Sequence, residues 1–148
     1  MRLFASLFLV VFVCGVASAQ KVSPALNHIA LHVQDLQRST RFYQQVVGLD
    51  TIPEPFHDGR HTWFTLGPAG QLHLISGATA PTPDKNTHLC FSTPSIDRFI
   101  QNLARHQVPY EDWSGKKNAI TLRVDKVQQI YFQDPDGYWI EVNDDFKQ

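Results

Sequence analysis

Cysteine, glutamate and surplus positive charge are all scarce in this chain of 148 residues. It has two cysteines, Cys14 and Cys90, and since we expect Cys14 to be removed with an export signal, no disulfide bond can form within the mature chain. Thirteen lysines and arginines stand against fourteen acidic residues, and the resulting net charge of −1 argues against a nucleic-acid-binding protein. The one long apolar run, from Leu3 to Val16, is shorter than the roughly 20 residues of a membrane-spanning helix.

Residues 1–19 have the pattern of a cleaved export signal. Arg2 gives a short positive start, the apolar run follows, and Ala17-Ser18-Ala19 before Gln20 fits the small-residue rule for signal cleavage. We therefore expect a periplasmic or secreted protein made of residues 20–148, folded as one domain and not attached to the membrane after cleavage.

The rest of the chain repeats one order of elements, which predicts the α+β class with two tandem βαβββ modules. In the first module, residues 26–76, we expect a strand at 26–33, a helix from Asp35 to Gly48, and strands near 49–52, 61–66 and 71–76. A linker with two prolines occupies residues 77–86. In the second module, residues 87–143, we expect a strand at 87–92, a helix from Ser95, and strands near 108–111, at 120–132 with a break within it, and at 138–143. Asp134-Pro135-Asp136-Gly137 is typical of the turn of the last hairpin.

Four of these strands carry a metal-binding side chain on the face opposite their helix. Side chains two residues apart share a face of a strand. On each of these strands the adjacent apolar side chains therefore point to one face and a single metal-binding side chain points to the other. These four side chains are His28, His73, His88 and Glu141. The glutamate is notable because the chain has only three. Cys90 shares the face of His88, where we expect a small buried group, with a reactive thiol as the alternative.

Three imidazoles and one carboxylate are costly to bury alone but would be satisfied by one divalent cation. A nitrogen-rich set favours Fe, Ni, Zn, Mn or Co over calcium and magnesium. We therefore predict that His28, His73, His88 and Glu141 hold one such ion. Two alternatives remain for His73. Its side chain supports a metal ligand without binding the ion itself, or it faces the substrate. The other loop and edge histidines, His57, His61 and His106, are expected to be solvated.

The chain resembles the vicinal oxygen chelate superfamily, which includes glyoxalase I, fosfomycin-resistance thiol transferases, extradiol dioxygenases and bleomycin-binding proteins. The similar segments span the mature chain: 28–31, Asp35-Leu36, Phe42-Tyr43 to Gly48-Leu49, 72–74, 87–89 and 134–141. The resemblance implies that His28, His88 and Glu141 are metal ligands. It also implies a curved mixed β-sheet around a metal-binding cleft with the helices on its outer face. At His73 glyoxalase I enzymes usually have a glutamate, and this is a departure from their pattern.

The resemblance implies a divalent-metal-dependent lyase or isomerase of the glyoxalase type, with Glu141 as its catalytic group as well as a metal ligand. Glutathione is scarce outside the cytoplasm, so we expect a small substrate that chelates the metal through two adjacent oxygens. The alternatives are an Fe(II) extradiol-type dioxygenase and a non-catalytic protein that binds a small molecule such as a drug or antibiotic. Expected substrate contacts are His32, Phe56, Arg60, Trp63 and Trp139. We expect a homodimer. The two modules that pair with each other belong either to the same chain or, if the copies exchange modules, to different chains.

Overall fold

The computed structural model describes residues 24–79 and 84–146. The expected export signal and residues 80–83 of the linker lie outside the described residues. In the described ranges, none of the helices has the length and apolar character that crossing a membrane requires.

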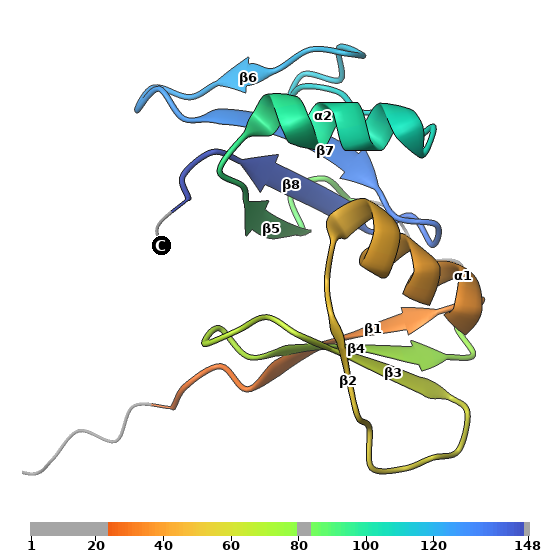
Figure 1. The fold of residues 1–148 in the computed structure, drawn as a ribbon. Helices are drawn as coiled ribbons and strands as arrows, with labels where there is room; N and C mark the ends of the chain where they lie inside the picture. Colours follow the sequence, from red (N-terminus) through yellow and green to blue (C-terminus); the bar gives the residue numbers. More distant parts are fainter. Residues whose placement is uncertain (1–23, 80–83, 147–148) are drawn as a thin grey trace, which may run out of the picture.

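The first module forms one four-stranded sheet with a helix after its first strand (Figure 1). Its elements are β1 (His28–Val33), α1 (Leu36–Phe42), the π-helical turn η1 (Tyr43–Val47), β2 (Thr51–Ile52), β3 (His61–Thr65) and β4 (Gln71–Ser76). The strand order is β1-β4-β3-β2, with β1 parallel to β4. Asp35 caps α1 by accepting a 2.9 Å hydrogen bond from the Arg38 N–H, and Gly48 ends the following turn η1 in the left-handed conformation at φ 89°.

The second module repeats this connectivity. Its elements are β5 (His88–Ser92), α2 (Ile96–Arg105), β6 (Thr121–Leu122), β7 (Gln128–Gln133) and β8 (Trp139–Asn143), in the strand order β5-β8-β7-β6. The predicted strand at 108–111 is reduced to isolated bridges that join Glu111 to Lys117 and to Tyr131. Pro109 has no N–H to offer a ladder of hydrogen bonds, which accounts for this shortening. The α+β class and the duplicated βαβββ unit are confirmed.

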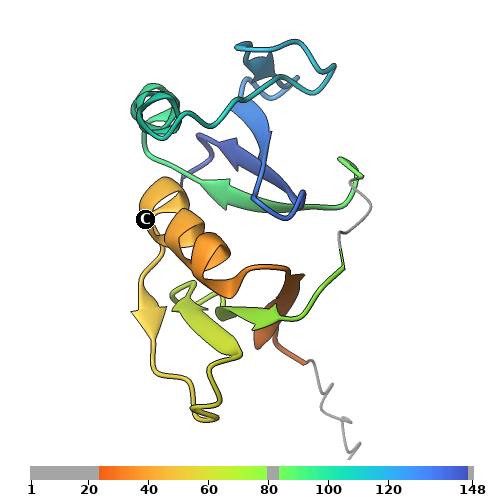
Figure 2. The same ribbon diagram turned by 90° about the vertical axis from the view of Figure 1, so that its right-hand side faces the viewer.

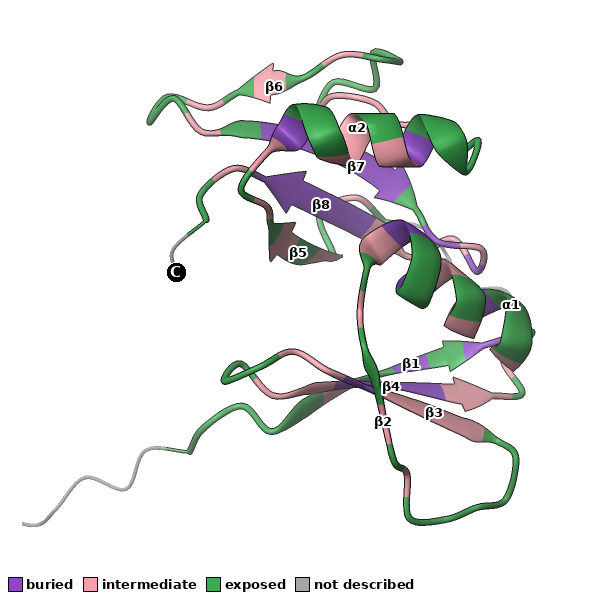
Figure 3. Ribbon diagram, in the orientation of Figure 1, coloured by how far each residue is buried: buried purple, intermediate pink, exposed green. Residues whose placement is uncertain are grey.

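The two sheets share one apolar core, and α1 lies between them (Figures 1 and 2). Both sheets contribute fully buried side chains to this core, among them Val33, Leu72, Leu74, Ile130 and Ile140. Buried residues are concentrated along β7 and β8 (Figure 3). The expected single curved sheet is therefore not found within one chain. Each small sheet has one apolar face that one short helix cannot cover, so the two modules cover each other.

The turn between β7 and β8 joins the modules through two buried carboxylates. The backbone N–H of Gln34 and the hydroxyl of Ser39 donate to Asp136 at 2.7 and 2.5 Å. The Tyr43 hydroxyl donates to Asp134 at 2.9 Å. The hairpin turn predicted from the sequence thus also holds α1 in place against the second sheet.

Candidate metal centre

The predicted alternation of side chains along the strands is confirmed. On β1, His28 and His32 are exposed, whereas Leu31 and Val33 are buried in the core. On β8, Ile140 and Val142 lie in the same core and Glu141 lies on the other face. The four proposed metal ligands therefore lie on the sheet faces that are turned away from the common core.

In the first module, three aromatic rings from adjacent strands form a stack. The ring of His73 on β4 stacks on that of His28 on β1, with centroids 4.3 Å apart and planes at 10°. The Trp63 ring on β3 covers the other side of His73, with centroids 3.9 Å apart and planes at 1°. His73 is held between two rings and is only 7% exposed.

Each of these two histidines has one ring nitrogen in a hydrogen bond and one without a hydrogen-bond partner among the residues that the structure describes. The Nδ1 atom of His28 is 2.8 Å from Oδ1 of Asn27, and Nε2 of His73 is 2.8 Å from Oε1 of Gln71. An amide oxygen only accepts, so the engaged nitrogens carry the hydrogens and the other nitrogens keep their lone pairs. Burial, and to a lesser degree the nearby His28 and His61, lower the pKa of His73, which favours its neutral, ligand-competent form.

An open hollow of about 510 Å³ lies over this stack. Phe56 and Trp63, two of the expected substrate contacts, line it together with Asn27, His28, His61, Gln71, His73 and Ile75. His32 and Arg60 are not among its lining residues.

His61 differs from the expectation that it is solvated, because its side chain is only 16% exposed. It lies against Phe56, with centroids 4.8 Å apart, and its Nδ1 is 2.9 Å from Oδ1 of Asp58. The signal that was missed is its spacing of two from Trp63 on one strand, which places both side chains on the same face.

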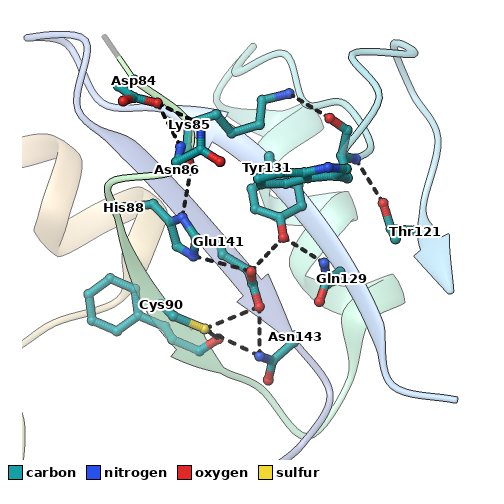
Figure 4. A network of polar contacts seen from close by, with 12 residues as sticks. Asp84, Lys85, Asn86, His88, Cys90, Thr121, Gln129, Tyr131, Glu141 and Asn143 are labelled. Atoms are coloured by element: carbon teal, nitrogen blue, oxygen red, sulfur yellow. Dashed lines mark hydrogen bonds and ion pairs between the residues drawn. The ribbon is translucent and has the colours of Figure 1, made fainter. Parts of the chain in front are cut away.

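The second module brings His88 and Glu141 together (Figure 4). The Nε2 atom of His88 is 3.3 Å from Oε2 of Glu141. On the other side of the ring, Nδ1 is 2.7 Å from the backbone oxygen of Lys85. That oxygen only accepts, so Nδ1 carries the hydrogen and the lone pair of a neutral His88 faces the carboxylate.

Glu141 is held by donors from three neighbours. The Tyr131 hydroxyl donates to Oε2 at 2.6 Å, and the Asn143 amide and the Cys90 thiol approach Oε1 at 3.0 and 3.3 Å. Burial alone would raise the pKa of Glu141, but these hydrogen bonds and the nearby His88 outweigh it and the pKa is lowered. The carboxylate is therefore ionised at neutral pH.

Cys90 does not form the buried group that was expected, because the residue is exposed at the surface. Its sulfur nevertheless contacts Glu141, and the Asn143 amide donates to it at 3.2 Å. Although the residue as a whole is exposed, its sulfur is partly buried against Glu141, and this desolvation together with the adjacent carboxylate raises the pKa of the thiol to about 12. The thiol stays protonated at physiological pH, which argues against the reactive alternative.

Trp139, the remaining expected substrate contact, lies in the second module rather than over the histidine stack. It lines a separate hollow with Tyr110, Glu111 and Tyr131. The amine of Lys85 is 4.5 Å from the centroid of its ring. The expected substrate contacts are thus divided between the two modules.

The four proposed ligands form two pairs and do not converge within one chain. Across residues 24–79 and 84–146, no group of three or more His, Cys, Asp or Glu side chains is arranged to hold a metal ion. The reason is the shared core: because both sheets turn their apolar faces inward, the His28–His73 and His88–Glu141 pairs face outward on different sheets.

The chemistry of the donors nevertheless fits a divalent transition metal. In each of the three imidazoles one ring nitrogen is held by an oxygen, the arrangement usual for metal-binding histidines, and in His88 the other nitrogen faces the carboxylate of Glu141. His28 and His73 cannot both bind one ion as they stand. An imidazole lone pair lies in the ring plane, and two nearly parallel planes do not meet within a metal–nitrogen bond of ~2.0–2.1 Å.

Comparison with known proteins matches nearly all of the described chain. A family model described as Glyoxalase/Bleomycin resistance protein/Dioxygenase superfamily matches residues 25–142. The chain is 31% identical over 131 residues to the metallothiol transferase FosB of Staphylococcus epidermidis, covering 80% of each chain. It is 28% identical over 163 residues to a lactoylglutathione lyase of Pseudomonas putida, covering 85% of this chain and 86% of that one. The solved structure of the fosfomycin resistance protein FosX from Listeria monocytogenes superposes with a TM-score of 0.68 at 22% identity, covering 84% of this chain and 96% of that one.

Proposed function

Since the chain belongs to the Glyoxalase/Bleomycin resistance protein/Dioxygenase superfamily, we propose that it is a divalent-metal-dependent lyase or isomerase whose small substrate chelates the metal through two adjacent oxygens. The observation that carries this proposal is the contact of His88 with Glu141. The Nε2 atom of His88 and the Oε2 atom of Glu141 are 3.3 Å apart, close enough for one ion to bind both, and the pKa of Glu141 is lowered, so its carboxylate is ionised.

His28, His88 and Glu141 would hold the ion, one of Fe, Ni, Zn, Mn or Co, with His73 as a fourth ligand or as the ring that supports His28. A bound ion of this kind supplies Lewis-acid stabilisation of negative charge on a substrate oxygen. Glu141 is the one acidic group among these residues, so it would be the proton acceptor as well as a ligand. Its lowered pKa makes it a weak base, which suits a substrate whose proton has been made acidic.

We propose that the complete site forms between two copies of the chain. The His28–His73 pair and the His88–Glu141 pair both face away from the core of their own chain. If the first module of one copy lies against the second module of its partner, each pair meets the complementary pair. A twofold dimer would then contain two identical sites.

The aromatic residues of the first module would give the substrate its apolar contact. Phe56 is 60% exposed over the hollow, and Trp63 lies beneath it at 6.0 Å between ring centroids. In the dimer, Trp139 of the partner's second module would face the same substrate. His32 and Arg60 would contact a substrate only if it extends beyond this hollow.

An Fe(II) extradiol-type dioxygenase is the second candidate, and the histidine stack favours it. If His73 keeps its place between Trp63 and His28, the ligands are two histidines and one carboxylate. That set leaves positions open for a catechol and for oxygen.

The test combines metal binding with an assay of each reaction class. Purified protein, freed of metal by a chelator, would be titrated with Zn²⁺, Ni²⁺ and Fe²⁺, and each form assayed with a hydroxy-ketone and a hemithioacetal. Metal-dependent turnover of either is the expected result. Oxygen uptake with catechol in the Fe²⁺ form would instead establish the dioxygenase, and tight binding of a small molecule without any metal would establish the binding protein and contradict the proposal.

We also propose that the enzyme works outside the cytoplasm, since residues 1–19 have the pattern of an export signal. Expression of the full chain and sequencing of its amino terminus tests this. We expect the mature protein to begin at Gln20. Protein that stays in the cytoplasm with Arg2 still present would contradict the proposed export.

A further inference from the structure

Lys85 connects the end of the linker to the second sheet through its side chain. Its amine forms an ion pair with Glu111 and donates to the backbone oxygens of Asp112 and Trp113 at 3.3 and 3.4 Å. The lysine side chain is only 16% exposed. A lysine amine this enclosed and with this many partners is fixed in position, unlike a surface lysine.

Glu111, the main partner of Lys85, is itself fixed to β7. Its backbone N–H donates to the Tyr131 carbonyl at 2.9 Å, and the Tyr131 N–H donates to the Glu111 carbonyl at 2.8 Å. The Lys85 amine also lies over the Trp139 ring, 4.5 Å from its centroid. The anchor of the lysine is therefore the sheet that carries Glu141.

The backbone of the same lysine contacts the candidate metal ligand. The Lys85 carbonyl accepts a hydrogen bond from Nδ1 of His88 at 2.7 Å (Figure 4). If this acceptor moved away, a neutral His88 would gain more by carrying its hydrogen on Nε2, where it can donate to the carboxylate of Glu141 at 3.3 Å. The nitrogen that faces Glu141 would then have no lone pair for a metal.

We propose that Lys85 is a positioning residue: by anchoring its side chain on Glu111 and Trp139, it holds its own carbonyl where it fixes the hydrogen of His88 on Nδ1. This inference rests on the proposed function in one respect: a hydrogen on Nδ1 leaves Nε2 of His88 available as a metal ligand, which matters only if the protein binds a metal. The arrangement itself is a property of the metal-free chain and can be measured there.

The test is the tautomer of His88 in metal-free protein, read from long-range ¹H–¹⁵N correlation spectra at a pH where the imidazole is neutral. In the wild type the hydrogen is expected on Nδ1. Lys85→Met keeps the aliphatic stem but removes the anchor, and it should shift the population toward the Nε2–H form. Lys126→Met, in the loop before β7, is the matched control and should leave the spectrum of His88 unchanged.

Zn²⁺ titration of the same proteins gives the second readout. Zn²⁺ binding by Lys85→Met should weaken by about 10-fold or more, the usual effect of losing a group that orients a ligand. Should Lys85→Met fail to fold, Glu111→Gln weakens the same anchor and takes its place. An unchanged His88 tautomer in a folded anchor variant, or an Nε2–H tautomer in the wild type, would overturn the inference. A wild type with the expected tautomer that binds no metal would refute the proposed function and leave the tautomer assignment standing.

Discussion

Tyr131 lies directly opposite Glu141 in the pairing of β7 with β8, and its hydroxyl donates to Glu141 Oε2 at 2.6 Å. The Gln129 amide in turn contacts the Tyr131 hydroxyl at 2.5 Å, and both side chains are buried. A chain of polar contacts thus fixes Oε2 of Glu141, the same carboxylate oxygen that Nε2 of His88 approaches.

Tyr131→Phe should therefore weaken metal binding while leaving the fold intact. Loss of the hydroxyl removes the shortest hydrogen bond to Glu141, which should raise the pKa of that carboxyl and leave it less well oriented. We expect Zn²⁺ affinity to fall by about 10- to 100-fold, measured by calorimetry. Tyr110→Phe, which changes a tyrosine that lies in the neighbouring hollow and not on Glu141, is the control. Equal affinities for the two variants would show that Tyr131 does not support the ligand.

His28 and His73 should differ in how much metal binding depends on them. His28→Ala removes a proposed ligand and should abolish tight Zn²⁺ binding. His73→Phe retains an aromatic ring between Trp63 and His28, so if His73 only supports His28 the affinity should fall by less than about 100-fold. His106→Ala, at the exposed end of α2, should change nothing. Loss of binding in His73→Phe as complete as in His28→Ala would instead make His73 a fourth ligand.

Stability should depend on pH through Asp134, whose pKa is raised above its ordinary value of 3.8 mainly by burial. A carboxyl with a raised folded pKa holds its proton more tightly in the folded protein. Its contribution to stability is therefore full below about pH 3.8 and is lost as the pH rises through the folded pKa. Asp134→Asn cannot titrate, and its amide oxygen can still accept from the N–H groups of Asp136 and Tyr138. Urea unfolding from acid to neutral pH should show the wild type losing stability relative to this variant, and parallel curves would contradict the assignment.

Much of this architecture is predictable from the sequence because strand alternation and helix caps are local. Asp35, Ser95 and the turn at 134–137 were each sufficient to place an element, and the family read from the sequence is confirmed by the match over residues 25–142. The contact of Tyr131 with Glu141 was also within reach, since a hairpin centred on Asp136 pairs those two positions. The pattern of histidines and carboxylates alone does not reveal this contact, because Tyr131 is neither.

The division of the candidate site could not be predicted in the same way. The alternation of side chains along a strand predicts on which face of its own sheet His28 or Glu141 lies. It does not predict whether the faces of the two sheets that carry these residues lie against each other. That depends on how the two modules pack, and the apolar residues of both sheets pack into one core that turns the polar faces outward. The single curved sheet around a cleft was wrong for one chain for this reason.

The most direct test of the divided site is complementation between two defective chains. One chain carries His28→Ala with His73→Ala, and the other carries His88→Ala with Glu141→Gln. Each alone should bind no Zn²⁺, whereas refolding the two together should restore binding at about a quarter of the sites of the wild type, because half of a random mixture is mixed dimer and each mixed dimer has one intact site. A mixture that stays free of metal, beside a wild type that binds it, would contradict a site shared between two copies.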